Sequence, residues 1–165
     1  MIHSTMGGMH MVAALAAILL GLVVILVPKG RAAHRLWGLA YAFSMLVTCA
    51  TALLLYGMTG HFGLFHAFAV LCLVYVVMGV VQAVLRRGAW LRRHLTWMGW
   101  SYLGLLAAAA TEASIRLPMF QHLTNGETFL LGGAISVVTV VIGWLMMLRW
   151  TRQALAHFTP MVKPS

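Results

Sequence analysis

The fold is decided by the stretch Lys29-Gly30-Arg31-Ala32-Ala33-His34-Arg35-Leu36-Trp37-Gly38-Leu39-Ala40-Tyr41, which joins two long apolar runs. It carries several of the chain's eleven Lys and Arg residues and places a histidine where the second run begins. A counterpart follows at Arg86-Arg87-Gly88-Ala89-Trp90-Leu91-Arg92-Arg93-His94, where a basic connection again ends in a histidine. The repeated pattern predicts helices joined by basic loops, with histidines in their first turns.

The composition predicts that lipid surrounds most of the chain. Of its 165 residues, 62% are hydrophobic and only 8% are charged, whereas a soluble domain has about 25% charged residues. One aqueous core cannot bury so many apolar side chains, so we expect an all-α integral membrane bundle in a lipid bilayer. The net charge of +9 comes without a nucleic-acid-binding motif, so nucleic acid is not an expected partner.

Five stretches are long and apolar enough to cross a bilayer, which takes about 20 residues. They cover residues 8–28, 34–57, 62–85, 94–116 and 128–150. Little sequence is left for a soluble domain, so we expect residues 1–165 to form a single domain of five transmembrane helices. Cys49 and Cys72 lie inside apolar runs and form no CxxC motif, which favours small buried hydrophobes.

The basic residues predict the orientation. With five spans, ten of the eleven fall on one side, which the positive-inside rule makes cytoplasmic. We therefore expect the N-terminus outside and the C-terminus inside, in a bacterial cytoplasmic (inner) membrane. The ten are Lys29, Arg31, Arg35, Arg86, Arg87, Arg92, Arg93, Arg149, Arg152 and Lys163.

Four histidines sort into two pairs by depth. His10 and His66 would lie near the outer surface, because their helices start there, and His34 and His94 near the inner one. Two imidazoles at one depth on different helices are what a bis-histidine haem requires, and bundle interiors commonly hold such cofactors. The pattern predicts one or two haem b groups. The alternative is that these histidines only pack or form hydrogen bonds.

Further residues fit the same hypothesis. Met98 lies one turn from His94 and is a reserve axial ligand for an inner haem. Four basic side chains near the inner histidines would bind haem propionates through charge-assisted hydrogen bonds. These are Arg31, Arg35, Arg92 and Arg93.

Glu112 is the only acidic residue inside a predicted span, and Arg116 follows it at i+4. This spacing favours an ion pair at the end of the fourth helix. The alternative is a carboxylate that handles protons or contacts a quinone.

The Met- and His-rich start of the chain, from Met1 to Met11, supports a second hypothesis. Thioether and imidazole ligands select Cu(I), and His61, His66 and His122 would lie on the same side. With only two acidic residues in the chain, a paired-carboxylate hydrolase is excluded. Without a phosphate-binding loop or zincin motif, ordinary hydrolysis and phosphoryl transfer are not expected.

The motif Gly30-Arg31-x-x-His34-Arg35-x-x-Gly38-x-x-Tyr41 is followed by Phe65-His66, and then by Arg86 with His94 and Met98. This pattern resembles a family of small bacterial integral membrane proteins, domain of unknown function 2306, from His10 to about Arg116. The resemblance implies an inner-membrane bundle and brings no activity with it. The four histidines also resemble, in architecture alone, those of two-haem transmembrane b-type cytochromes.

We therefore expect a haem protein that carries electrons across or within the membrane, with a quinone or a redox partner protein as its partner. Whether it is a membrane oxidoreductase, and its oligomeric state, stay open. The alternatives are a metal-ion (copper) binding or transport protein that uses the outer Met and His residues, and a structural or assembly subunit.

Overall fold

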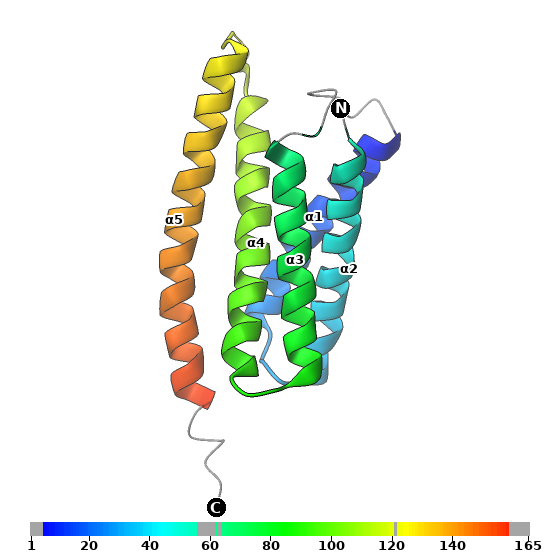
Figure 1. The fold of residues 1–165 in the computed structure, drawn as a ribbon, viewed down its shortest axis with the longest axis vertical. Helices are drawn as coiled ribbons and strands as arrows, with labels where there is room; N and C mark the ends of the chain where they lie inside the picture. Colours follow the sequence, from blue (N-terminus) through cyan, green and yellow to red (C-terminus); the bar gives the residue numbers. More distant parts are fainter. Residues whose placement is uncertain (1–4, 56–61, 63, 121, 159–165) are drawn as a thin grey trace, which may run out of the picture.

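The computed structural model describes residues 5–55, 62, 64–120 and 122–158. As the composition predicted, the secondary structure of this part is helical, with five long α-helices and one short 3-10 helix (Figure 1). The helices are α1 (Thr5–Leu26), α2 (Ala32–Leu54), α3 (Leu64–Leu85), α4 (Trp90–Ile115), η1 (Pro118–Phe120) and α5 (Asn125–Phe158).

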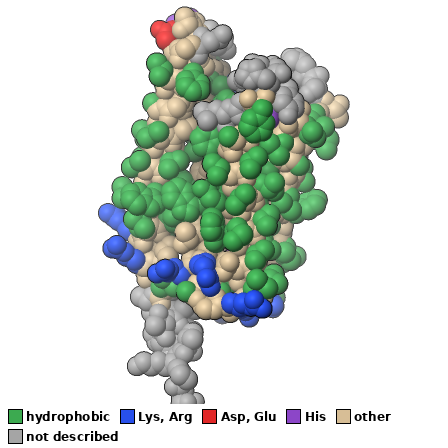
Figure 2. All heavy atoms as spheres, in the orientation of Figure 1, with side chains coloured by type: hydrophobic (Ala, Val, Ile, Leu, Met, Phe, Trp, Pro, Cys, Tyr) green, Lys and Arg blue, Asp and Glu red, His purple; other side chains and the backbone are tan. Residues whose placement is uncertain are grey.

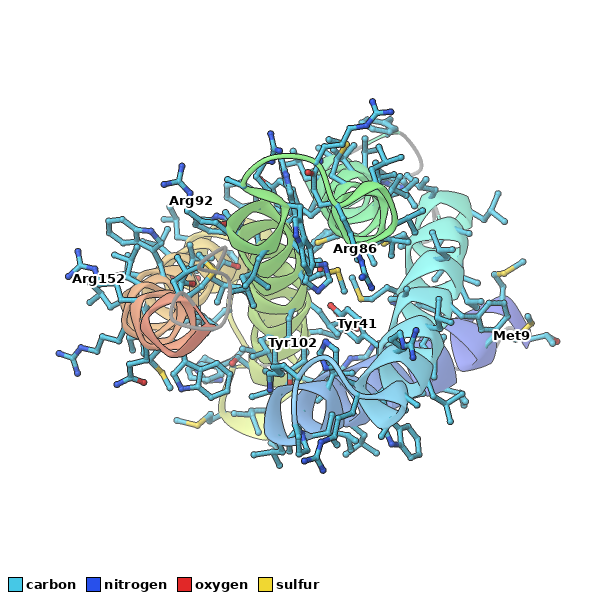
Figure 3. The ribbon with its side chains drawn as sticks, turned by 90° about the horizontal axis from the view of Figure 1, so that it is seen from below. Met9, Tyr41, Arg86, Arg92, Tyr102 and Arg152 are labelled. Atoms are coloured by element: carbon cyan, nitrogen blue, oxygen red, sulfur yellow. The ribbon has the colours of Figure 1, made fainter. Side chains whose placement is uncertain are left out.

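The first four helices form a ring. Each packs against the next along the chain, and α4 also packs against α1, which closes the ring. Viewed along the bundle axis, α1 lies diagonally opposite α3, and α2 diagonally opposite α4 (Figure 3). The fifth helix lies outside the ring and packs against α4 (Figure 1).

Four described helices are long and apolar enough to cross a membrane, namely α1, α2, α3 and residues Gly126–Gln153 of α5. The sequence predicted five apolar spans, and α4, the fourth of them, is not apolar enough to be selected. It carries Arg92, Arg93 and Glu112 near its ends and several Trp, Ser and Thr residues between them. Because α4 contacts α1, α3 and α5, more of its surface meets protein, where polar side chains find partners.

The centre of the ring is closely packed. Tyr41 and Met45 of α2, Val76 of α3 and Ser101 of α4 are the largest fully buried side chains. Tyr41 and Ser101 share a hydrogen bond of 2.9 Å between their hydroxyl oxygens, which joins two diagonal helices across the interior. A buried hydroxyl without a partner is costly, so this contact fixes how α2 faces α4.

Glycines let the helices approach closely. A Cβ atom added at Gly21 of α1 would overlap the ring of Tyr102, whose hydroxyl donates to the Ile18 carbonyl at 3.1 Å. A Cβ atom at Gly79 of α3 would overlap the side chain of Met98. Small residues at such positions permit the tight packing that holds helices together in lipid.

The α4–α5 contact also uses small and polar residues. Thr111 Oγ1 lies 2.7 Å from Ser136 Oγ and donates to the Gly132 carbonyl at 3.2 Å. Further along, Leu103 fits against Gly143. The small and polar residues of α5 therefore support its packing against α4. This helix ends at Phe158 rather than at residue 150.

The two ends of the bundle differ in charge. Lys and Arg side chains gather at one end, the lower end in Figure 2, which we call the basic end. The described residues that define it are Lys29, Arg31, Arg35, Arg86, Arg87, Arg92, Arg93, Arg149 and Arg152. We call the other end of the bundle the opposite end. It carries both acidic residues, Glu112 and Glu127, together with Arg116.

Candidate functional site

The ring places the four histidines in two diagonal pairs. His34 and His94 lie in the first turns of α2 and α4, at the basic end. His10 and His66 lie near the first residues of α1 and α3, at the opposite end. Members of each pair therefore come from helices that face each other across the ring (Figures 1 and 3).

His94 is oriented by a backbone carbonyl of the neighbouring helix. Its Nδ1 atom lies 2.8 Å from the Gly79 oxygen on α3. A carbonyl only accepts hydrogen bonds, so Nδ1 carries the proton and the Nε2 lone pair is left for another partner. Histidines that bind metals usually have this arrangement.

His10 is held in a similar way by α2. Its Nδ1 atom lies 3.1 Å from the Thr48 carbonyl and 3.0 Å from Thr51 Oγ1. The Thr51 hydroxyl donates to the Val47 carbonyl at 2.7 Å, so it accepts from the imidazole. Here too, the proton on Nδ1 leaves Nε2 as the free acceptor.

The imidazole of His34 is incompletely hydrogen-bonded. Its Nδ1 atom is buried and has no hydrogen-bond partner among the described residues. Lys29 and His94 lie within electrostatic range of its ring. The structure thus leaves a buried nitrogen that an added ligand could satisfy.

His66 is the most buried of the four, with 4% of its surface exposed. It lies in the first turn of α3, and its ring centre is 5.2 Å from that of Phe62. An apolar surround of this kind excludes water from the imidazole.

The other predicted site residues lie at the basic end, where one is packed between helices and the others are exposed. Met98 packs its sulfur against Gly79, between α3 and α4. The four arginines assigned to propionates are all exposed, and they come from the α1–α2 connection, α2 and α4. They are Arg31, Arg35, Arg92 and Arg93; Figure 3 shows Arg92 pointing away from the ring.

Lys29 belongs structurally to α1. Its ammonium group donates to the carbonyls of Val24 at 3.3 Å and Val27 at 3.1 Å, and also to that of Ile25. These are carbonyls at the end of α1 that lack a helical partner, so the side chain caps the helix. Burial lowers the pKa of Lys29.

Glu112 and Arg116 form the expected ion pair at the opposite end. Arg116 Nε donates to Glu112 Oε1 at 2.9 Å, and Nη2 contacts the same oxygen. Arg116 is exposed and Glu112 partly so. The geometry is that of a local i,i+4 pair.

Other candidate sites are less developed. Cys49 and Cys72 are free and buried, as expected. In the part of the chain that the structure describes, no group of three or more His, Cys, Asp or Glu residues could hold a metal ion. His122 is exposed, while residues 1–4 and His61 of the proposed copper cluster lie outside the described residues.

Sequence reasoning missed the partners that orient the histidines. Gly79 acts through its carbonyl, so no side-chain signal marks it. Thr48 and Thr51 lie three residues apart and so share one side of α2. That spacing, near the end where α1 begins, was a usable signal for the partners of His10.

The comparisons with known proteins identify a family and no closer relative. A model of the family described as "Predicted membrane protein (DUF2306)" matches residues 7–151. No curated protein and no solved structure matches the chain, so the likeness to two-haem cytochromes gains no support from them. Since the match covers most of the sequence, including all four ring histidines, the chain belongs to the DUF2306 family and is a multi-pass membrane protein.

Proposed function

We propose that the protein is a b-type haem protein that carries electrons across or within the membrane. The observation that carries this proposal is the diagonal placement of the two histidine pairs. His10 and His66 would ligate a haem near the opposite end, and His34 and His94 one near the basic end. Ligands on facing helices can approach a flat cofactor from both sides, as axial ligation requires.

The hydrogen bonds of the imidazoles support the proposal. His10 and His94 each direct Nδ1 at a backbone carbonyl, which leaves Nε2 able to bind iron. In His34 a buried Nδ1 atom has no described partner. Met98, packed one turn from His94, would be a replacement ligand. When bound, haem iron supplies one-electron redox chemistry, and the protein orients it and excludes water.

The basic end would also neutralise the cofactor. Haem propionates are anionic, and guanidinium groups bind carboxylates through paired hydrogen bonds. Arg31, Arg35, Arg92 and Arg93 are near enough along the chain to the two basic-end histidines to serve. All four are exposed, so their side chains would have to turn from their positions in the structure to reach propionates at the mouth of the ring.

We further propose five spans, with α4 as the fourth, in a bacterial cytoplasmic membrane. The basic end would face the cytoplasm, because positively charged loops are retained there. The N-terminus would then lie outside and the C-terminus inside. A quinone or a redox partner protein would supply or accept the electrons.

A reduced-minus-oxidised spectrum with haem quantitation tests the function. It compares the wild type, from cells supplied with haem, with His10→Ala, His66→Ala, His34→Ala and His94→Ala. His122→Ala is the matched control, because this exposed histidine lies at the opposite end and outside the ring. We expect the first two variants to lose the same haem and the next two to affect only the other one.

Two results would change the conclusion. A colourless wild type would end the haem proposal and favour metal-ion binding, with copper as the first candidate, or a structural or assembly role. One haem that is lost only in the His10 and His66 variants would keep the site at the opposite end. It would remove electron transfer between two haems.

A further inference from the structure

Residues 86–93, which form the α3–α4 connection and the start of α4, concentrate positive charge at the basic end. Four arginines lie within eight residues, and all four are exposed. They form two neighbouring pairs, one on each side of Gly88 and Trp90. The pairs are Arg86 with Arg87 and Arg92 with Arg93.

The connection has a defined shape. Arg93 donates a hydrogen bond through Nη2 to the Arg87 carbonyl, which ties the two pairs together. The Arg86 guanidinium lies 5.5 Å from the centre of the Trp90 ring, a cation–π distance. Tryptophan favours the headgroup level of a bilayer, so Trp90 places the arginines at that depth.

Arg86 has a backbone conformation in which glycine would be less strained. Its φ angle is 49°, in the left-handed region, and its amide closes α3 by donating to the Gln82 carbonyl at 3.1 Å. Helices that end in this way usually have glycine at the corresponding position. A strained arginine at a loop indicates that its side chain has a role.

The chain offers no acidic side chain to balance these charges. Its two acidic residues, Glu112 and Glu127, both lie at the opposite end of the bundle. The anion must therefore come from outside the chain. At headgroup depth beside a tryptophan, the abundant anion is the phosphate of a lipid.

We propose that residues 86–93 bind an anionic phospholipid of the leaflet at the basic end, with preference for a lipid that carries two phosphates. Guanidinium groups match phosphate oxygens with paired hydrogen bonds. The two arginine pairs, one in the α3–α4 connection and one in the first turn of α4, offer a place for each phosphate. This inference concerns the apoprotein and does not depend on the haem proposal.

The test is a lipid titration of the purified full chain in an uncharged detergent, followed by native mass spectrometry. The probes are diphosphatidylglycerol, phosphatidylglycerol, phosphatidylcholine and inorganic phosphate. The variant Arg86→Gly/Arg87→Gln is compared with Arg149→Gln/Arg152→Gln, which removes two charges from α5 at the same end. Helix content by circular dichroism verifies that both variants are folded.

We expect the wild type to bind diphosphatidylglycerol at least tenfold more tightly than phosphatidylcholine, and more tightly than phosphatidylglycerol. The loop variant should lose at least tenfold in affinity, and the α5 control less than threefold. Equal losses in both variants would show attraction by net charge alone and overturn the site. If millimolar inorganic phosphate displaced the lipid, the ligand of this site would be a free anion and not a lipid.

A second measurement separates binding from structure. Arg86→Gly alone relieves the left-handed strain, so we expect it to raise the unfolding temperature in lipid-free detergent while it weakens lipid binding. A lower unfolding temperature without lipid would mean that Arg86 stabilises the turn itself, and would overturn its role as a lipid ligand.

Discussion

Gly79 serves two neighbours at once. Its carbonyl accepts a hydrogen bond from His94 Nδ1, and the absence of a side chain makes room for Met98. Both neighbours lie on α4, one turn apart. A single glycine thus sets how closely α3 and α4 approach and how the imidazole of His94 is turned.

We predict that Gly79→Ala destabilises the protein by about 1–3 kcal/mol, the usual effect of overpacking. The added Cβ atom would lie 2.7 Å from Met98 Cγ and 3.3 Å from the Met98 backbone nitrogen. The backbone atom cannot turn away as a side chain can. Unfolding in detergent measures the change.

Gly38→Ala is the matched control. Gly38 lies within α2, and nothing stands within 4 Å of the position that its Cβ would take. Alanine is the better helix former by up to about 1 kcal/mol, so this variant should be neutral or more stable. If both variants lost the same stability, close packing at Gly79 would not be the cause.

The ion pair of Glu112 supports a second prediction. Because its partner Arg116 is exposed, we expect Glu112→Gln to cost only about 0.3–0.5 kcal/mol. Under the proposed function, haem content and electron transfer should be unchanged. Arg116→Gln should have the same small effect, since each change breaks the same pair.

Unfolding and reduction kinetics on the purified variants provide the measurement. A stable Glu112→Gln protein that no longer transfers electrons would contradict this prediction. Glu112 would then be a proton-handling or quinone-contacting group.

At this scale, the sequence predicted residue types better than contacts. Cys49 and Cys72 are buried, as their positions inside apolar runs predicted. On α4, Ala108 lies seven residues after Ser101, at helical spacing, yet Ser101 is buried and Ala108 is exposed. Spacing alone therefore does not predict which part of a helix its neighbours cover.

Among the elements, α4 differs most from its description in the sequence. It is the least apolar of the long helices and has the most packing partners, since it contacts α1, α3 and α5. Hydropathy alone does not select it as a span. The two facts are linked, because hydroxyl groups that lipid would reject find partners on neighbouring helices.

The contact of α4 with α5 can be tested at Thr111. Its hydroxyl reaches Ser136 and the Gly132 carbonyl on α5. We predict that Thr111→Val lowers the stability by about 0.5–1.5 kcal/mol, the contribution of a hydrogen bond between helices. Unfolding in detergent, or protease sensitivity of α5, measures it.

Thr96→Val is the control on the same helix. The Thr96 hydroxyl donates to the Arg92 carbonyl one turn earlier, within α4 itself. Its loss should leave the α4–α5 contact intact and change stability little. A larger effect at Thr96 than at Thr111 would show that α5 is held by apolar packing alone.

Helix positions followed from the apolar runs because spanning a bilayer sets the length of each run. The end of α5 did not, since the predicted stretch ends at residue 150 whereas the helix continues through Arg152 and Gln153 to Phe158. Basic side chains are good helix formers, so a change in polarity marks the membrane surface rather than the end of a helix.

For the whole molecule, charge separates the two ends and orientation follows from it. We predict that a reporter active only outside the cytoplasm works at the N-terminus and fails at the C-terminus. A reporter active only in the cytoplasm should give the converse. The physical reason is the retention of basic loops on the cytoplasmic side.

Both ends reporting from one compartment would contradict this topology. It would also end the assignment of α4 as a span, because four crossings return the chain to the side on which it began. A charge-reversed control, with Lys29, Arg31 and Arg35 changed to Glu, should lower the fraction of correctly oriented chains.

The closed ring also governs how the protein is made. The Ser101 partner of the Tyr41 hydroxyl lies 60 residues further along the chain, and α4 is the helix that closes the ring. At about 5–20 residues per second, synthesis of that interval takes on the order of 3–12 s. Within this interval α3 follows α1 and α2, and until α4 is complete the three helices would form an open arc whose polar groups lack their partners on α4. Synthesis of α4 must therefore be complete before the first three helices pack against a helix of another protein.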